Sequence, residues 1–394
     1  MNPAFRCAAL GVAIAGLPLA GATQTLSAAH QDRSAAGETA PLRVELDSSA
    51  GTDGVDARLG LARGHRLRAG LRGSLGLQAR VQRLQADAPF AATRTQALGV
   101  SVHETLATGW GSLSLDAGSE QVRVESRPEA RRRVPVHRYA LGAAWDLSPG
   151  WQLTGRWAHQ ERAPREDELF ANGPAAGAWI AGDPSLGKAR EHRAEVGVTW
   201  RGGPHRASVA LFESRYGNHL HLEATGRQRD VAPGRAVPEL AWRQAPARVR
   251  GLQAQGRVRL HERRAGVLDL ELRGALLRGT QEATGQALPG LPPAQVGATL
   301  AGERGAWGGR VGFDHAARQR RVPAGQPAGA SHTLWGAALS YRSKAGGADM
   351  LWYARIENLG NRKASSAASL LAQGESGRSA LQGRTLRVGV NASF

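Results

Sequence analysis

Two histidines and a glutamate near the middle of the chain have the residue types and spacing that suit metal binding. His219, His221 and Glu223 alternate with Leu220 and Leu222, so an extended strand places the three polar side chains on one face. Imidazole and carboxylate groups a few ångströms apart bind Zn²⁺, which takes three protein ligands plus water in an open site. The spacing predicts a metal site here; a solvated strand end is the alternative.

A second polar cluster is the acidic run Glu166, Asp167 and Glu168. It could attract a cation, or it could be a solvated part of a loop. No nucleophile elbow and no metalloprotease helix accompanies the serine, histidine and aspartate residues of the chain. We therefore expect no enzyme activity, no catalytic residue and no bound cofactor.

The elements that must position these residues are predicted to be β-strands. Sixteen amphipathic segments can be marked from residue 42 to residue 394, with apolar and polar residues alternating. In the stretch 252–260, for example, apolar or small residues alternate with Gln253, Gln255, Arg257 and Arg259. A charged inner face cannot be the core of a β-sandwich, because buried unpaired charge is too costly. The pattern predicts an all-β, transmembrane antiparallel barrel, whose lumen tolerates such a face.

The lengths of the connections support this prediction. Every second junction contains a tight turn, and the junctions between them are longer, up to the stretch 161–189. Transmembrane barrels have short periplasmic turns and long extracellular loops, so this alternation puts both chain ends in the periplasm and the 161–189 loop outside. The turns are expected at 64–65, 108–109, 148–150, 202–204, 262–265, 303–305 and 344–347.

Both ends of the chain carry signals of export and assembly. Arg6 precedes an apolar stretch and a small-residue cleavage pattern, which predicts a signal peptide over 1–22. A polar, flexible lead is expected over 23–41, followed by the barrel over 42–394. The only cysteine, Cys7, would leave with the signal peptide. Phe394 ends the last apolar alternation and resembles the signal by which the barrel-assembly machinery recognises its substrates.

The charge balance invites another hypothesis. The formal net charge is +18 with a pI near 11.4, which is typical of nucleic-acid-binding proteins. However, the arginines are spread along strands and loops, and only 131–133 form a dense run. That run is predicted to be a solvated loop or a contact for anionic lipid head groups or an anionic ligand. We expect outer-membrane lipid and lipopolysaccharide as partners, and no nucleic acid.

Several motifs resemble those of TonB-dependent outer-membrane receptors, most closely the branch that takes up zinc or haem-like ligands. The similarity is spread over most of the barrel, and its order along the chain matches the family. The segments are 161–174 (ERAPREDELFANGP), 182–186 (GDPSL) with 195–200 (EVGVTW), 215–218 (RYGN), 250–254 (RGLQA), 288–293 (LPGLPP), 357–361 (ENLGN) and the close 383–394. The family motif of the external loop corresponds to Arg162, Ala163, Pro164, Glu168, Leu169, Gly173 and Pro174.

The resemblance implies a barrel of 22 strands around an N-terminal plug, with a box that binds the TonB energy transducer. About sixteen strands are expected here, and only residues 23–41 precede the first of them. We therefore expect the plug to be absent, and TonB to be a partner only if a plug is supplied. The family branch also tends to carry histidine where Ala175 and the segment 364–368 stand in this chain, so its zinc or haem specificity is not carried over.

The sequence favours an outer-membrane receptor or transporter barrel for uptake of a metal ion or metal complex, incomplete without plug and TonB box. Zinc or a metal complex is expected as the transported ligand and not as a cofactor. A passive, porin-like outer-membrane channel is the alternative, because sixteen strands without a plug would enclose an open lumen.

Overall fold

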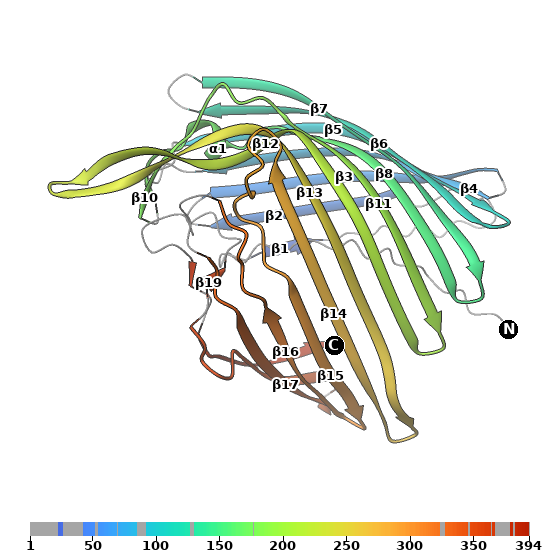
Figure 1. The fold of residues 1–394 in the computed structure, drawn as a ribbon. Helices are drawn as coiled ribbons and strands as arrows, with labels where there is room; N and C mark the ends of the chain where they lie inside the picture. The colour runs from blue at the N-terminus through green and yellow to red at the C-terminus, as the bar shows by residue number, and fades with distance from the viewer. Residues whose placement is uncertain are drawn as a thin grey trace.

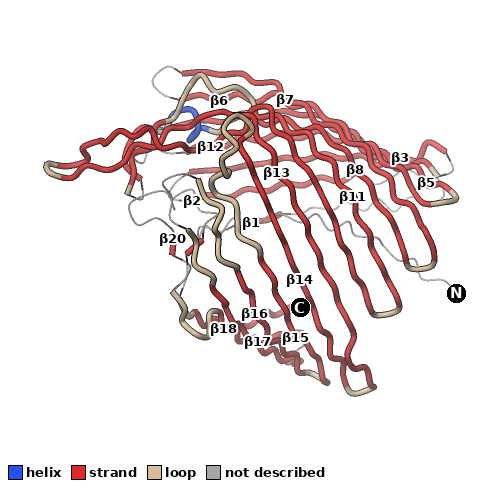
Figure 2. The backbone as a smooth tube through the Cα atoms, viewed as in Figure 1, coloured by secondary structure: helices blue, strands red, loops and turns tan. Residues whose placement is uncertain are grey.

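The structure is a computed structural model of the 394-residue chain. It describes residues 23–26, 42–51, 54–68, 70–84, 92–126, 130–175, 177–323, 328–345, 347–363, 365–366, 379–380 and 383–393. Almost all of them belong to one curved antiparallel sheet, with a single short helix near one end (Figures 1 and 2). The signal peptide predicted over 1–22 and the assembly signal predicted at Phe394 lie outside the described residues.

The described elements follow the chain in the order of their numbers. They are β1 (Thr23–Leu26), β2 (Leu42–Gly51), β3 (Gly54–Arg68), β4 (Leu71–Leu84), β5 (Thr93–Thr108), β6 (Gly111–Ser126), β7 (Ala130–Ser148), β8 (Trp151–Arg162), α1 (Glu166–Phe170), β9 (Asn172–Ala175), β10 (Ala178–Ala181), β11 (Ala189–Gly202), β12 (His205–Ala232), β13 (Arg235–Arg263), β14 (Gly266–Gln281), β15 (Gln295–Arg304), β16 (Trp307–Ala316), β17 (His332–Ala345), β18 (Ala348–Glu357), β19 (Ser365–Ser366), β20 (Ser379–Ala380) and β21 (Thr385–Ser393).

Sixteen long strands form a meander in which each strand pairs antiparallel with the next one. These strands are β2 to β8, β11 to β18 and β21, which confirms the predicted number and class. β8 pairs with β11 across the 163–188 loop, and β18 pairs with β21. The short strand β1 pairs with β2, so four residues of the predicted flexible lead are part of the sheet.

A short connection recurs at every second junction as predicted, but not every junction between them is long: β12 and β13 are also joined by two residues, at the end of an extended hairpin. Two-residue turns join β5 to β6, β7 to β8, β11 to β12, β13 to β14, β15 to β16 and β17 to β18, within a few residues of the expected positions. The turn expected at Gly64-His65 is wrong, because both residues lie inside β3, paired with Ser74 and Gly73. The ladder continues to Arg68, paired with Leu71, and Gly70 before Leu71 adopts a φ of +82° that side-chain-bearing residues rarely take.

The two faces of the sheet differ in chemistry. One face, called the outer face below, carries large apolar side chains that are exposed, such as Leu75 (59%), Leu98 (58%) and Leu211 (57%). The other, inner face carries polar side chains and cross-strand ion pairs, such as Arg80 with Asp56 (3.0 Å) and Arg273 with Asp314 (2.6 Å). Exposed apolar surface on this scale suits lipid rather than water. Among the described residues, no helix has the length and hydropathy to cross a membrane.

Aromatic side chains gather at the end of the sheet where the two-residue turns lie. Trp110 packs edge-on against Trp145 (6.0 Å between ring centroids), and Trp151 lies 6.2 Å from Trp200. Trp307 lies 4.7 Å from Tyr341. These rings come from neighbouring hairpins and form the girdle expected at one membrane interface.

Candidate ligand-binding site

The long connection between β8 and β11 folds into a compact unit of its own. It contains α1 and the antiparallel pair β9–β10, in which Gly173 is opposite Ile180 and Pro174 is opposite Trp179. β10 also pairs in parallel with β13, at Glu239 to Ala241. The "NGP" segment of the family motif thus lies in a paired strand, and the connection is not an irregular loop. We call residues 163–188 the folded loop.

The centre of the folded loop is the buried carboxylate of Glu168, which is 2% exposed. Arg162 donates two hydrogen bonds to it, of 2.8 and 2.9 Å, in the bidentate geometry that guanidinium and carboxylate groups favour. The backbone N–H of Arg165, the N-cap residue of α1, donates a third at 2.7 Å, as a glutamate at the third helical position does in a capping box. The "RAP…EL" spacing therefore serves to place an arginine and a helix N-cap on the same carboxylate.

The "GDPSL" segment closes the folded loop against α1. The backbone N–H of Gly182 donates to the carbonyl of Ala171 (2.6 Å), and that of Asp183 donates to the carbonyl of Glu168 (2.9 Å). The Asp183 carboxylate accepts hydrogen bonds from the backbone and hydroxyl of Ser185 (2.8 and 2.6 Å), which lowers its pKa. This turn directs Leu186 into the core, where it is 3% exposed.

Gly182 is required by the close approach of these backbones. A Cβ atom added there would lie 2.7 Å from the carbonyl carbon of Leu169, and backbone cannot move aside as a side chain can. We expect Gly182→Ala to destabilise the folded loop by about 1–3 kcal/mol. Gly187→Ala is the matched control, because its Cβ would meet only the amide of Gln244 at 3.7 Å. The rate of tryptic cleavage within 162–190 measures the difference; equal rates in the two variants would contradict the expectation.

Side chains from the surrounding strands hold the folded loop in place. Arg132 of β7 donates to the carbonyls of Pro184 and Leu186. Gln244 of β13 exchanges two hydrogen bonds with the backbone of Gly187, at 3.0 and 2.8 Å. Sequence analysis missed both anchors. The two-residue period of a strand was the signal that could have revealed Arg132, because it places this side chain on the face opposite Arg131 and Arg133.

A further anchor ties the loop to the end of β8. Lys188 donates to the Glu161 carboxylate at 2.6 Å, and the backbone N–H of His137 donates to it at 3.1 Å. The Glu161 carboxylate thus links the end of the folded loop to β7 and β8.

Apolar packing seals the folded loop onto the sheet. Its residues share one buried cluster with the inner face of β6 and with the extended β12–β13 hairpin. The cluster comprises Val124, Leu169, Ala171, Ala178, Ile180, Leu186, Leu220, Leu222, Leu240 and Trp242. Leu220 and Leu222 take part in it, so the side of β12 opposite the histidines is buried against the loop.

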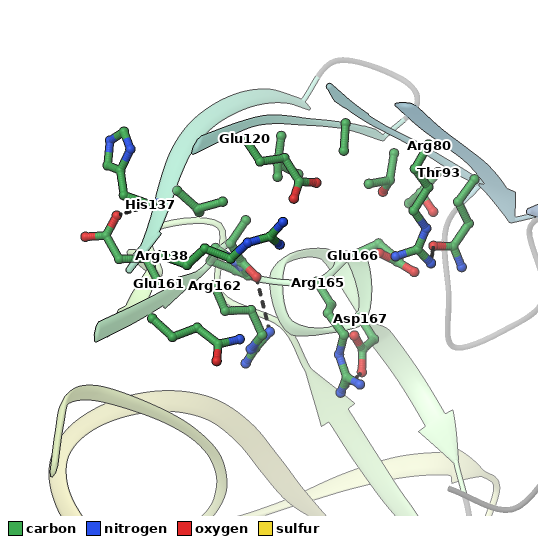
Figure 3. A pocket seen from close by; sticks show the side chains of 18 of the residues that line it. Arg80, Thr93, Glu120, His137, Arg138, Glu161, Arg162, Arg165, Glu166 and Asp167 are labelled. Atoms are coloured by element: carbon green, nitrogen blue, oxygen red, sulfur yellow. Dashed lines mark hydrogen bonds and ion pairs between the residues drawn. The ribbon is translucent and has the colours of Figure 1, made fainter. Parts of the chain in front are cut away.

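Beside the folded loop lies a cavity of about 660 Å³. Its walls are the inner faces of β4 to β8 on one side and residues 162–171 on the other (Figure 3). The lining combines arginines 80, 138, 162 and 165 with Glu120, Glu161, Glu166 and Asp167. The hydroxyl of Thr95, which also lines the cavity, is buried without a hydrogen-bond partner. Burial raises the pKa of Asp167, against the lowering effect of Arg165.

The cavity suits a polar ligand of small-molecule size. Its volume is in the range of ligand pockets, and it offers cationic, anionic and hydroxyl groups on one wall or another. Of the family-motif residues, the structure brings Arg162, Ala163 and Pro164 to the cavity. Glu168 and Leu169 lie behind it in the support of the loop.

The predicted metal residues lie on the β12–β13 hairpin. The rings of His219 and His221 stack with centroids 6.0 Å apart, while Glu223 lines a separate polar pocket with Asp183 and Arg243. Among the described residues, no group of three His, Cys, Asp or Glu side chains could hold a metal ion. The two histidines therefore share a face as predicted, but the three residues do not form a three-ligand site in this structure.

Tyr216 is the last residue of β12 that pairs with β11. His219 therefore lies beyond the part of β12 that β11 covers. Burial lowers the pKa of His219 to about 4, and the charges of His221 and Arg162 reinforce the shift. Between about pH 4 and 6.5 the unfolded chain binds a proton that the folded chain does not. Stability is therefore fully present above about pH 6.5 and falls as the pH drops towards 4.

We expect the hairpin to lose at most about 3 kcal/mol of stability across that window. Hydrogen exchange of the 218–242 amides, measured from pH 7 to pH 4, checks this. His219→Gln should flatten the pH profile, whereas His261→Gln, at an exposed position at the other end of the strand pair, should leave it unchanged. A profile identical in the wild type and in His219→Gln would show that another group is responsible.

Other family motifs also have structural roles near the ends of strands. Leu288 of the "LPGLPP" segment is 4% exposed and packs on Phe212, Ala247 and Val249. In the "ENLGN" segment, Asn358 and Asn361 adopt positive φ angles of 50° and 48°, which asparagine tolerates better than most residues. These motifs thus shape connections at the long-loop end of the sheet.

An apolar outer face, an aromatic girdle at the short-turn end and a folded loop over a cavity at the other end together define an outer-membrane β-barrel of the receptor type. The chain belongs to the TonB-dependent receptor-like β-barrel family, whose model matches residues 18–359. Proteins of this family are outer-membrane receptors and transporters, not enzymes. Their long loops face the outside, so we call this end of the barrel extracellular.

Solved structures show the same fold at low sequence identity. The copper transporter OprC matches with a TM-score of 0.66 and 17% identity, over 90% of this chain and 57% of that chain. The FrpB iron transporter from Neisseria meningitidis (F3-3 variant) matches with a TM-score of 0.59 and 12% identity, over 89% and 58%. The siderophore receptor PirA from Acinetobacter baumannii matches with a TM-score of 0.58 and 12% identity, over 90% and 68%. This chain thus spans under three-fifths of the length of the first two.

Proposed function

We propose that this chain forms the ligand-recognising barrel of an outer-membrane receptor for uptake of a metal ion or metal complex. The observation that carries the proposal is the cavity of about 660 Å³ enclosed by the folded loop at the extracellular end. The structural relatives are named for copper, iron and siderophore ligands, and the motifs of this chain resemble the zinc or haem branch. Metal ions and their complexes are the class that these ligands share.

The mixed lining favours a complex over a bare cation. Four arginines lie beside four carboxylates around the cavity, and a chelate presents oxygen acceptors to the guanidinium groups, which a bare cation does not. We propose TonB as a partner only where a plug domain is supplied with this barrel. The passive-channel alternative gains no support, since the matched family consists of receptors.

Binding to the refolded full chain in detergent micelles tests the proposal. The probes are Zn²⁺, Cu²⁺, haem and a ferric catecholate chelate, and tryptophan fluorescence reports binding. Ala97→Trp fills the cavity from the inner face of β5 and should weaken binding of the recognised probe at least tenfold. Ala117→Trp is the matched control, because Ala117 lies on the outer face between Val102 and Tyr139. Failure of all four probes to bind, or equal binding to Ala97→Trp, would refute the proposal.

A further inference from the structure

A cluster of arginines lies on the outer face of β4 to β7, at the extracellular ends of these strands. Cross-strand pairing places Arg83 opposite Arg94, Arg94 opposite Glu125, and Glu125 opposite Arg131. In the adjoining outer-face row, Arg123 is opposite Arg133. We call these five arginines and Glu125 the arginine patch.

The arginine patch is poorly neutralised by the protein. Glu125 is its only acid; it pairs with Arg123 and lies 3.4 Å from Arg131. Arg83, Arg94 and Arg133 are exposed and have no hydrogen bond or ion pair among the described residues. Like charges on adjacent strands, about 5 Å apart, destabilise a sheet unless a counter-ion binds. An external anion with several charges would therefore stabilise the arginine patch by binding to it.

Apolar side chains lie nearer the girdle on the same outer face, four to eight residues from the patch arginine of the same strand. They are Leu98 (58% exposed) and Val100 (56%) on β5, Leu77 (44%) on β4, and Leu141 (55%) on β7. A soluble polyanion such as nucleic acid would bind the arginines but would not cover this apolar surface. An amphiphile with an anionic head and acyl chains matches both parts of the surface at once.

The height of the patch fits a membrane interface. Along β7, Arg133 is twelve positions from Trp145, which belongs to the aromatic girdle at the other end. At about 3.3 Å per residue and a strand tilt near 45°, this corresponds to roughly 28 Å along the membrane normal. The hydrocarbon core of a bilayer is about 30 Å thick, so the guanidinium groups lie at the level of outer-leaflet head groups.

We propose that the arginine patch is a docking site for a phosphorylated glycolipid of the outer leaflet, namely lipopolysaccharide, whose phosphate groups bind the arginines while its acyl chains cover Leu77, Leu98, Val100 and Leu141. Arginine binds phosphate through two parallel N–H donors. The site lies on the lipid-facing side of the barrel wall, opposite the cavity, and so is independent of the transported ligand.

Lipid binding to the refolded full chain in a neutral detergent tests the proposal. The probes are lipopolysaccharide, the same lipid after removal of its phosphates, and inorganic phosphate as a competitor. The test variant replaces Arg83, Arg94, Arg131 and Arg133 with glutamine. A charge-matched control replaces four exposed arginines at hairpin ends outside the patch with glutamine, namely Arg227, Arg235, Arg263 and Arg264.

The patch variant should bind lipopolysaccharide roughly 100-fold more weakly, and the control variant within twofold of the wild type. Wild-type protein should lose the same affinity when the phosphates are removed, and millimolar inorganic phosphate should not displace the lipid. Unchanged binding by the patch variant, or equal binding of the dephosphorylated lipid by the wild type, would overturn the proposal. The comparison with dephosphorylated lipid uses only wild-type protein, so it tests the role of the phosphate groups even if the patch variant does not fold.

Discussion

Replacing Val209 with arginine is expected to destabilise the barrel in a bilayer by about 1–3 kcal/mol, because the residue lies between the girdle and the midplane. Val209 is 46% exposed on the outer face of β12, between Val198 of β11 and Ala254 of β13. Ala207, two residues away on the same face, is opposite Trp200 of the girdle, so this row lies in the half of the apolar band that is nearer the girdle. A guanidinium group there loses its hydration and gains no partner, since every neighbour in the row is apolar.

The adjacent residue provides the matched control. Ser208 lies on the inner face, opposite Thr199 and Gln255, so Ser208→Arg places the same guanidinium among polar groups in the lumen. We expect this control to change stability by less than about 1 kcal/mol. Urea unfolding in lipid vesicles measures both variants. A similar loss in both would mean that the outer face is not the lipid-facing surface.

Replacing Glu168 with alanine is expected to open the folded loop. The substitution leaves Arg162 without its carboxylate and removes the acceptor of the Arg165 backbone N–H. Removal of one partner of a buried ion pair typically costs about 3–5 kcal/mol. Arg162 is 44% exposed, so water can replace part of the lost interaction, and we expect about 2–3 kcal/mol.

This loss should appear as local opening of residues 163–188 with the barrel intact. Trypsin should cut this range at least tenfold faster, while the mobility of the folded barrel in gels stays unchanged. Glu166→Ala is the matched control, because Glu166 is the first residue of the same helix and forms no ion pair in the described structure. The double variant with Arg162→Ala should cost little more than Glu168→Ala alone; additive effects would show that the two side chains act separately.

Much of the fold could be predicted because a barrel strand repeats every two residues. The alternation of apolar and polar residues revealed sixteen strands and identified their outer faces. Turn positions followed less closely from the sequence: Gly64-His65 has turn-forming residue types, yet the β3–β4 ladder continues past it to Arg68, paired with Leu71. Cross-strand hydrogen bonds decide where a hairpin ends, and local residue types only bias that outcome.

The sequence by itself determined the class of the protein, since the period-two pattern, the aromatic girdle and the ordered motifs are all local in the chain. Only the tertiary structure decided the site. The ion pair of Arg162 with Glu168 supports the folded loop. Arg132 contacts that loop, whereas Arg131 and Arg133 lie on the outer face. His219, His221 and Glu223 do not converge on a common ligand position. The physical reason is that the face on which a side chain lies follows from its position in one strand. Which side chains meet at a cavity depends instead on how the folded loop packs against the strands of the barrel.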